Sequence, residues 1–222
     1  HITKNTSAII TPHIFGIPCD IEGIEKLAKK YDLKVIYDGA QAFGTCINKK
    51  HIGNYGDITM FSLHAIKVYN AIEGGVLTYQ DDALHKKFEL YRNFGISYGE
   101  MGNDVLVSGI NAKMNEFQAA MGILGLDIID EEITQRKKLA DIYIKEFNKI
   151  EGISTYNYQQ NIDYNYAYFP IRIHEKQFGM NRDKLFIELK NKGIITRKLY
   201  DILCCDYSYY KKRGYKKDIE YA

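Results

Sequence analysis

The stretch KVIYDGAQAFG, residues 34–44, decides the fold. Residues 34–37 form a near-continuous apolar run, which is typical of a strand buried in a parallel sheet. Asp38 follows directly, at the carboxyl end of that strand, where open α/β sheets bind their ligands. Many strands end in aspartate because it caps the next helix, so Asp38 alone leaves a structural and a functional interpretation open. The stretch predicts an α/β fold.

Alternating strands and helices are predicted on both sides of this stretch. Asp20 should cap a helix whose acidic residues come early and whose lysines come late, which suits the helix dipole. The predicted order is a strand at 7–10, a helix at 21–31, a hairpin or irregular excursion at 45–57, strands at 58–62 and 76–79, and a helix from 81 or 82 to 93 closed by Gly95.

The second half predicts fewer strands and longer helices. Residues 96–109 lack an apolar period and are glycine-rich, which suggests a functional loop or a mobile segment. Further elements are expected as a helix beginning near 115, a second long helix at 127–150, strands at 167–173 and 194–197, and a capped helix at 181–193. We therefore predict a large domain over 1–126, a connecting helix over 127–150 and a small α+β domain over 151–222.

Composition narrows the function classes. The 222 residues are 45% hydrophobic and 26% charged, with a net charge of +2. This charge is too small to drive binding to nucleic acid or to an anionic membrane, and no apolar run is long enough to span a bilayer. The start has no initiator Met, and we expect no signal peptide there. Four cysteines without a Cys-x-x-Cys pair favour free thiols in a reducing cytoplasm over a structural disulfide or a zinc site, so we expect no bound metal.

A second candidate segment is FSLHAIKVYNAIEGG, residues 61–75. Lys67 follows an apolar strand, between Ile66 and Val68, and precedes a Gly-Gly turn. A lysine in such surroundings loses hydration, so its amine can be neutral enough to attack a carbonyl. The same pattern also fits a surface lysine beside an ordinary turn.

A third segment is GINAKMNEFQAA, residues 109–120. Asn111 precedes a predicted helix whose cap is near Asn115. Backbone amides at a helix start attract anions, although both asparagines can equally be ordinary caps.

Together the three segments, in this order, resemble fold-type I pyridoxal-phosphate aminotransferases of the DegT/DnrJ/EryC1/StrS family. VIYDGAQAFG resembles the family's Asp-x-Ala-Gln segment. FSLHAIKVYNAIEGG resembles its Phe-Ser-Phe, Schiff-base lysine and Glu-Gly-Gly, and GINAKMNEFQAA resembles its Gly-x-Asn-x-Arg-Met before a Gln-Ala-Ala helix. TSAIITPHIFGIPCDIEGI and GIITRKLYDIL resemble family segments as well, so the resemblance covers nearly the whole chain.

The resemblance implies a role for each site residue. Lys67 would hold pyridoxal phosphate through a Schiff base and shuttle a proton during transamination, whereas the dehydratase branch of the family has histidine there. Asp38 would pair with the pyridine nitrogen, Gln41 would lie against the ring or its 3-hydroxyl, and Ser62 would donate to the phosphate. Asn111 would reach the phosphate of the neighbouring subunit.

His64 and Arg197 are weaker candidates for substrate contacts. His64 belongs to a His-Ala-x-Lys form of the motif seen in enzymes that aminate thymidine-diphosphate keto-6-deoxysugars, and a satisfied structural histidine is an equal alternative. Arg197 belongs to the segment that resembles the family's Gly-Ile-x-x-Arg element.

The implied fold is a large fold-type I domain, with a parallel-rich sheet and helices, plus part of a small α+β domain. The implied function is amination of a nucleotide-linked keto-6-deoxysugar, with thymidine diphosphate as the expected nucleotide and glutamate as the expected donor. Such an enzyme would be a homodimer with shared active sites and would serve surface polysaccharide or O-antigen synthesis.

The chain also departs from the family pattern. Tyr37, Gly39 and Lys113 replace an acidic residue, an alanine and an arginine. Lys113 keeps the charge but not the bidentate geometry of arginine. The family's phosphate-binding Gly-Thr turn and its ring-stacking aromatic lie upstream of His1, which suggests the middle of a larger enzyme.

Two alternatives to an active aminotransferase remain open. One is a non-catalytic regulatory or binding protein, or an inactive fragment, on the same fold. The other, a nucleotide-binding α/β domain, is weakened because no strand is followed by a Gly-x-Gly-x-x-Gly turn.

Overall fold

The computed structural model describes residues 1–99 and 102–214. By their internal contacts, these residues divide into two compact units. The first unit comprises residues 1–99, 102–146 and 155–170, and the second comprises residues 147–154 and 171–214. The segment 155–170, which the sequence assigned to the small domain, thus packs with the first unit.

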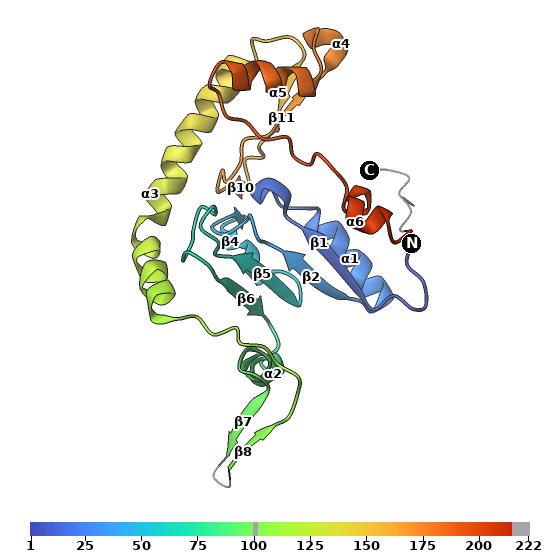
Figure 1. Ribbon diagram of the computed structural model, residues 1–222, viewed down its shortest axis with the longest axis vertical. Helices are drawn as coiled ribbons and strands as arrows, with labels where there is room; N and C mark the ends of the chain where they lie inside the picture. The colour runs from blue at the N-terminus through green and yellow to red at the C-terminus, as the bar shows by residue number, and fades with distance from the viewer. Residues whose placement is uncertain (100–101, 215–222) are drawn as a thin grey trace. The chain divides into compact units, whose positions relative to one another are not determined.

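A four-stranded sheet forms the centre of the first unit (Figure 1). Its order is β1 (Ala8–Pro12), β2 (Lys34–Asp38), β5 (Ile58–Ser62) and β6 (Gly75–Tyr79). The first three strands run parallel and β6 is antiparallel to β5. The four predicted strands are confirmed, with ends shifted by one or two residues.

Helix α1 (Ile21–Tyr31) covers one face of this sheet through a continuous apolar core. The Asp20 carboxylate accepts a hydrogen bond from the Gly23 amide, which confirms the predicted cap. Fully or nearly fully buried members of this core include Ile21, Ala28, Val35, Tyr37, Ile52 and Phe61. Burial at this face fixes the register of β2, because a slip of one residue would expose Val35 and Tyr37.

Helix α3 (Glu116–Phe147) packs on a second core that includes Leu63, Tyr69, Ala71 and Ile129. It is one helix of 32 residues, whereas the sequence predicted two. The glycines in its first half allow close packing rather than breaking the helix. Tyr69 donates its hydroxyl to the Gly122 carbonyl at 3.0 Å, and a Cβ at Gly125 would lie 3.1 Å from the Tyr69 ring.

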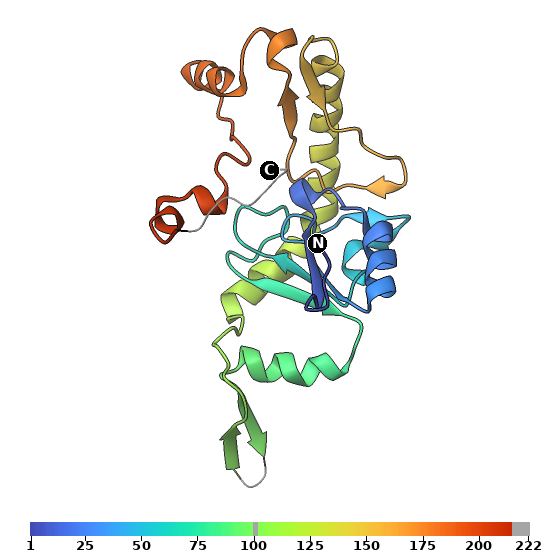
Figure 2. The same cartoon turned by 90° about the vertical axis from the view of Figure 1, so that its right-hand side faces the viewer.

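The remaining elements of the first unit are short, apart from α2 (Ala83–Arg92). β3 (Cys46–Ile47) pairs with β4 (Lys50–His51) as the predicted hairpin, and β10 (Ile162–Asp163) extends that pair. The predicted loop at 96–109 instead contains a hairpin of β7 (Ile96–Gly99) and β8 (Gly102–Val105), which projects beyond α2 in Figure 2. All four residues of β8 are exposed, so this strand needs no alternation of apolar and polar residues. The sequence therefore carries no pattern that predicts the hairpin.

The second unit holds a small sheet of β9 (Ile153–Thr155) and β11 (Ile171–Ile173), with helices α4 (Glu175–Phe178), α5 (Arg182–Asn191) and α6 (Ser208–Lys211). The Asn181 side chain caps α5 as predicted. The strand predicted at 167–173 is limited to residues 171–173, and residues 194–197 form no strand. Residues 194–197 lie exposed without a partner strand, so their apolar run forms no ladder.

Within the described part of the chain, no helix is long and apolar enough to cross a membrane. The four cysteines there are free. No group of three or more histidine, cysteine, aspartate or glutamate side chains in those residues could hold a metal ion.

Candidate active site

Lys67 lies in a tight turn that follows β5. Its amide donates to the His64 carbonyl at 2.9 Å, and the chain then returns so that the Ala71 amide donates to the Leu63 carbonyl at 2.9 Å. This loop anchors both ends of the segment beside the buried Leu63 and Ala71. The turn therefore presents Lys67 from a fixed base.

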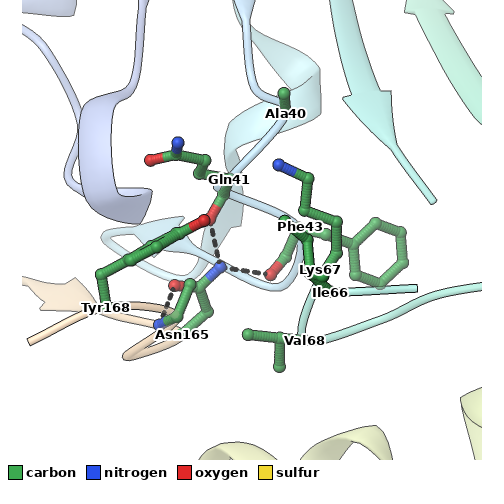
Figure 3. A pocket seen from close by; sticks show the side chains of 9 residues that line it. Ala40, Gln41, Phe43, Ile66, Lys67, Val68, Asn165 and Tyr168 are labelled. Atoms are coloured by element: carbon green, nitrogen blue, oxygen red, sulfur yellow. Dashed lines mark hydrogen bonds between the residues drawn. The ribbon is translucent and has the colours of Figure 1, made fainter. Parts of the chain in front are cut away.

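The Lys67 side chain points into a small pocket of the first unit, toward Ala40 and Gln41 (Figure 3). The nine lining residues come from the turn after β2, the turn after β5 and the segment before β11, and they are Ala40, Gln41, Phe43, Ile66, Lys67, Val68, Asn165, Ala167 and Tyr168. Among the described residues, the Lys67 amine has no hydrogen bond or ion pair. It is available for a ligand.

Asp38 ends β2 at the sheet edge from which the Lys67 segment leaves β5. Its carboxylate accepts a hydrogen bond from the Ala40 amide at 2.9 Å, and no cationic side chain among the described residues pairs with it. The next residue, Gly39, donates its amide to the Met60 carbonyl at 2.8 Å. A Cβ at Gly39 would lie 2.9 Å from that same oxygen, so glycine suits this close approach.

Gln41 lines the pocket, and its side chain is held by the neighbouring turn. Its Oε1 accepts a hydrogen bond from the Phe15 amide at 2.6 Å. This bond orients the Gln41 side chain before any ligand binds.

Ser62 and His64 stabilise the turn that carries Lys67, and neither lines the pocket. The Ser62 hydroxyl accepts from the His64 amide at 3.3 Å. His64 accepts from the Ile66 amide through Nδ1 at 3.3 Å, and its Nε2 lies 3.4 Å from a Glu73 carboxylate oxygen. These contacts give His64 a structural role and leave a substrate contact as a prediction.

Asn111 lies outside the pocket, beside the end of α2. It forms a β-bridge with Asn93, and Lys113 Nζ donates to the side-chain oxygens of both asparagines at 2.8 and 2.9 Å. The charge that Lys113 keeps in place of arginine is used to tie these two segments together.

Arg197 belongs to the second unit and is exposed. Next to it, Lys198 forms ion pairs with Asp183 and Asp201, which also pair with Arg182. This network fixes the chain around Arg197 within that unit.

Asn165 and Tyr168 are pocket residues that the sequence interpretation missed. They lie in a run that reads NYAYFP, which was predicted to be largely strand. The sequence signal that could have identified this segment as part of the site is its density of aromatic residues. One of them, Tyr168, packs on Phe15 with ring centroids 5.9 Å apart.

His13 is a buried polar residue next to the site. Its ring stacks on Tyr37 at 4.9 Å, its backbone amide donates to the Asp38 carbonyl at 2.9 Å, and its Nδ1 accepts from the Cys19 amide at 3.2 Å. Burial lowers the pKa of His13 to about 4, against a smaller upward effect of the Asp38 charge. His13 is therefore neutral at pH 7, with its proton on Nε2, which has no partner among the described atoms.

The arrangement suits a carbonyl-bearing cofactor with a basic ring nitrogen. Within the described ranges, the turn after β5 supplies the Lys67 amine without an anionic partner, and the end of the neighbouring strand β2 supplies the Asp38 carboxylate without a cationic partner. A carboxylate of this kind can hold a ring proton while the amine forms a covalent bond. The residues present fit pyridoxal phosphate.

A model of the DegT/DnrJ/EryC1/StrS aminotransferase family matches residues 1–222. Members of this family depend on pyridoxal phosphate. The chain is 35% identical over its whole length to a dTDP-4-amino-4,6-dideoxy-D-glucose transaminase of Shigella dysenteriae, of which it covers 59%. Over 90% of its length it is 32% identical to a GDP-perosamine synthase of Escherichia coli O157:H7, of which it covers 53%.

Solved structures show the same fold. DesI in the presence of its TDP-sugar product matches 95% of the chain with a TM-score of 0.84 and 30% identity, over 53% of DesI. PseC of Helicobacter pylori, an aminotransferase of pseudaminic acid biosynthesis, matches 95% with a TM-score of 0.87 and 26% identity, over 57% of PseC. The chain thus spans little more than half the length of these relatives.

The low pKa of His13 predicts a pH-dependent stability. An unfolded histidine binds its proton near pH 6.5 and folded His13 only near pH 4. Acidification through this window therefore favours the unfolded state. We expect His13 to lower the free energy of unfolding by about 1–2 kcal/mol between pH 6.5 and pH 5. Urea titrations should show a flatter pH dependence for His13→Phe, and an unchanged slope would contradict a neutral buried His13.

Proposed function

The chain belongs to the DegT/DnrJ/EryC1/StrS aminotransferase family, and we propose that it carries the catalytic lysine of a pyridoxal-phosphate-dependent sugar aminotransferase. The observation that carries this proposal is the Lys67 amine, unpaired among the described residues, in a pocket lined by Ala40. Asp38 does not itself line this pocket, but its carboxylate accepts a hydrogen bond from the Ala40 amide at 2.9 Å. A purely binding role would need neither an unpaired amine nor an unpaired carboxylate there.

Lys67 and Asp38 have separate tasks in this proposal. When bound, pyridoxal phosphate supplies an electron sink for the charge that develops on the reacting carbon. Lys67 Nζ holds the cofactor covalently, and once released it takes the proton from one carbon and returns it to another. The Asp38 carboxylate holds the proton on the ring nitrogen, which keeps the sink effective. Gln41, fixed by Phe15, orients the ring.

The phosphate group needs donors from more than one segment. Ser62 lies at the carboxyl end of β5 and can turn its hydroxyl from the His64 amide toward an anion. Asn111 is too remote to line the pocket of its own chain, which supports a role at the site of a second copy.

Exposed apolar side chains support a homodimer. Phe117 is 82% exposed, Leu124 is 61% exposed and Ile128 is 58% exposed, at helical spacing on the first half of α3 directly after the Asn111 segment. An apolar surface of this extent on one helix face is typical of an interaction site. A second copy packed there would bring its Asn111 toward the first copy's site.

For the substrate, we propose a nucleotide-linked keto-6-deoxysugar, with thymidine diphosphate as the nucleotide and glutamate as the amino donor. The names of the Shigella relative and of DesI's product point to thymidine nucleotides, while the GDP-perosamine synthase keeps the nucleotide open to test. His64 and Arg197 are candidate substrate contacts. A relative that acts in spore coat polysaccharide biosynthesis supports a polysaccharide pathway.

The proposed function also includes a division of the chain into domains and a location in the cytoplasm. We propose that residues 1–126 form a cofactor domain, 127–150 a connecting helix and 151–222 part of a small domain, with segment 155–170 contributing to the cofactor pocket. The free cysteines support a cytoplasmic protein.

Replacement of the two central residues should separate their tasks. In the full-length gene product, Lys67→Ala should reduce transamination of a keto-sugar panel by at least about 10⁴-fold, because it removes covalent anchor and proton carrier together. Asp38→Asn should still bind cofactor but react more slowly by about 10²-fold or more, because an amide cannot hold the ring proton. Stopped-flow absorbance measures both rates. Wild-type turnover by purified Lys67→Ala would contradict the proposed role of Lys67, whereas no turnover by the wild-type protein across the panel would favour a binding protein.

Mixing experiments test the shared site. Lys67→Ala and Asn111→Asp chains should each be inactive alone, but their heterodimer contains one site with neither lesion and should recover part of the wild-type activity. A matched mixture of Lys67→Ala with Asp38→Ala should recover none, because both lesions lie in the chain's own site. Equal recovery, or no recovery from verified heterodimers in both mixtures, would contradict the proposed role of Asn111.

A further inference from the structure

Asn165 is an almost completely buried polar side chain at the base of the Lys67 pocket, with 1% of its surface exposed. We infer that Asn165 is a positioning residue, which sets the geometry of the pocket wall opposite Lys67 by holding the turn that carries Gln41. The inference rests on the proposed function and adds a residue to it from a segment more than 120 positions away.

Every polar atom of the Asn165 side chain has a partner. Nδ2 donates to the carbonyl of Gln41 at 2.8 Å and to the carbonyl of Phe43 at 2.9 Å. Oδ1 accepts from the Ala167 amide at 3.0 Å. Figure 3 shows the bonds from Asn165 to Gln41 and Phe43 as dashed lines. One amide therefore fixes two walls, the Gln41–Phe43 turn and the Ala167–Tyr168 segment.

The neighbouring turn at Gly16 is shaped to accept this amide. A Cβ at Gly16 would collide with Asn165 Oδ1 and lie 2.8 Å from the Gln41 carbonyl, and the Gly16 φ of +78° favours glycine. Two hydrogen bonds join the same turn to the Gln41 segment: the Phe15 amide donates to Gln41 Oε1, and the Thr45 hydroxyl donates to the Gly16 carbonyl at 3.1 Å.

This network makes Asn165 more than a packing residue. The two carbonyls that it satisfies belong to Gln41, which lines the pocket, and to Phe43, which does so as well. Buried carbonyls that lose their donor must find another by moving, because leaving them unpaired is costly. The movement available to them is a shift of the turn that carries Gln41, whose side chain would then leave its position relative to Lys67.

The substitution Asn165→Asp removes the two hydrogen bonds that Asn165 Nδ2 donates and leaves the shape of the side chain almost unchanged. The carboxylate keeps an acceptor for Ala167 but faces two carbonyl oxygens to which it cannot donate. Burial and those oxygens raise the pKa of such a carboxyl, so that it becomes protonated, and able to donate once, as the pH falls. In the full-length gene product, spectral titration with pyridoxal phosphate should give about tenfold weaker binding than wild type at pH 8. The ratio to wild type should narrow to within about threefold at pH 6.

Thr59→Val is the matched control. Thr59 is fully buried in the same unit, its hydroxyl donates to the Tyr55 carbonyl at 2.9 Å, and it does not line the pocket. This variant should lower the melting temperature while its cofactor affinity stays within about twofold of wild type at both pH values. If Asn165→Asp is unfolded at pH 8, the uncharged Asn165→Ser carries the test and should show the loss of affinity without the pH-dependent recovery.

A second measurement asks whether Asn165 acts through Gln41. The affinity lost on Asn165→Asp should be smaller in a Gln41→Ala background than in the wild type, because the side chain that is misplaced is already absent. Full additivity would overturn the link to Gln41. Wild-type affinity of folded Asn165→Asp at both pH values, or a loss matched by Thr59→Val, would overturn the inference as a whole. Failure of the wild-type protein itself to bind pyridoxal phosphate would instead contradict the proposed function.

Discussion

Parallel pairing of β2 with β5 is the constraint on which the site depends. The register places Asp38 opposite Met60, so the residues that follow each strand emerge at one edge of the sheet. Asp38 and Lys67 are 29 positions apart in the chain. Asp38 nevertheless ends β2 at the same edge of the sheet from which the Lys67 turn leaves β5. The apolar core below, with Val35 and Tyr37 against α1, holds that register, because a slip would bring both buried side chains into water.

Opposite charges at one sheet edge normally pair with each other or with neighbours. Here the described part of the chain gives Lys67 no anion and Asp38 no cation, while surface lysines such as Lys34 and Lys49 have carboxylate partners. Buried His13, whose backbone amide donates to the Asp38 carbonyl, adds an Nε2 atom that has no hydrogen-bond partner among the described atoms. Unmet polar groups lower stability, and their concentration at one place is typical of a site that a ligand completes.

Local patterns predicted the parts of the fold that depend on local chemistry. The four main strands, the Asp20 and Asn181 caps and the hairpin at β3 and β4 all follow from apolar runs, cap residues and turn residues that are neighbours in the sequence. The prediction of two helices in place of α3 was wrong, because the sequence does not reveal whether a glycine such as Gly125 breaks the helix or admits a ring such as that of Tyr69. The exposed strand β8 gave no apolar signal at all.

Site residues, too, were predicted where the evidence is local in the sequence and missed where it depends on distant contacts. Lys67 and Gln41 were identified by motifs that lie within a few residues, and both line the pocket. Asn165 could not be identified, because its significance lies in bonds to carbonyls of a distant turn, and any asparagine in a loop has the same sequence signature. Side-chain contacts between remote segments are the information that a single sequence does not display.

The central claim is that the Lys67 amine binds the carbonyl of pyridoxal phosphate. Borohydride reduction of the full-length protein with its cofactor, followed by proteolysis and mass spectrometry, tests this claim directly, because reduction makes the bond between lysine and cofactor permanent. The account predicts that the peptide containing Lys67 carries the phosphopyridoxyl mass and that Lys67→Ala abolishes the labelling. A label at another lysine, or no label in a protein saturated with cofactor, would contradict it.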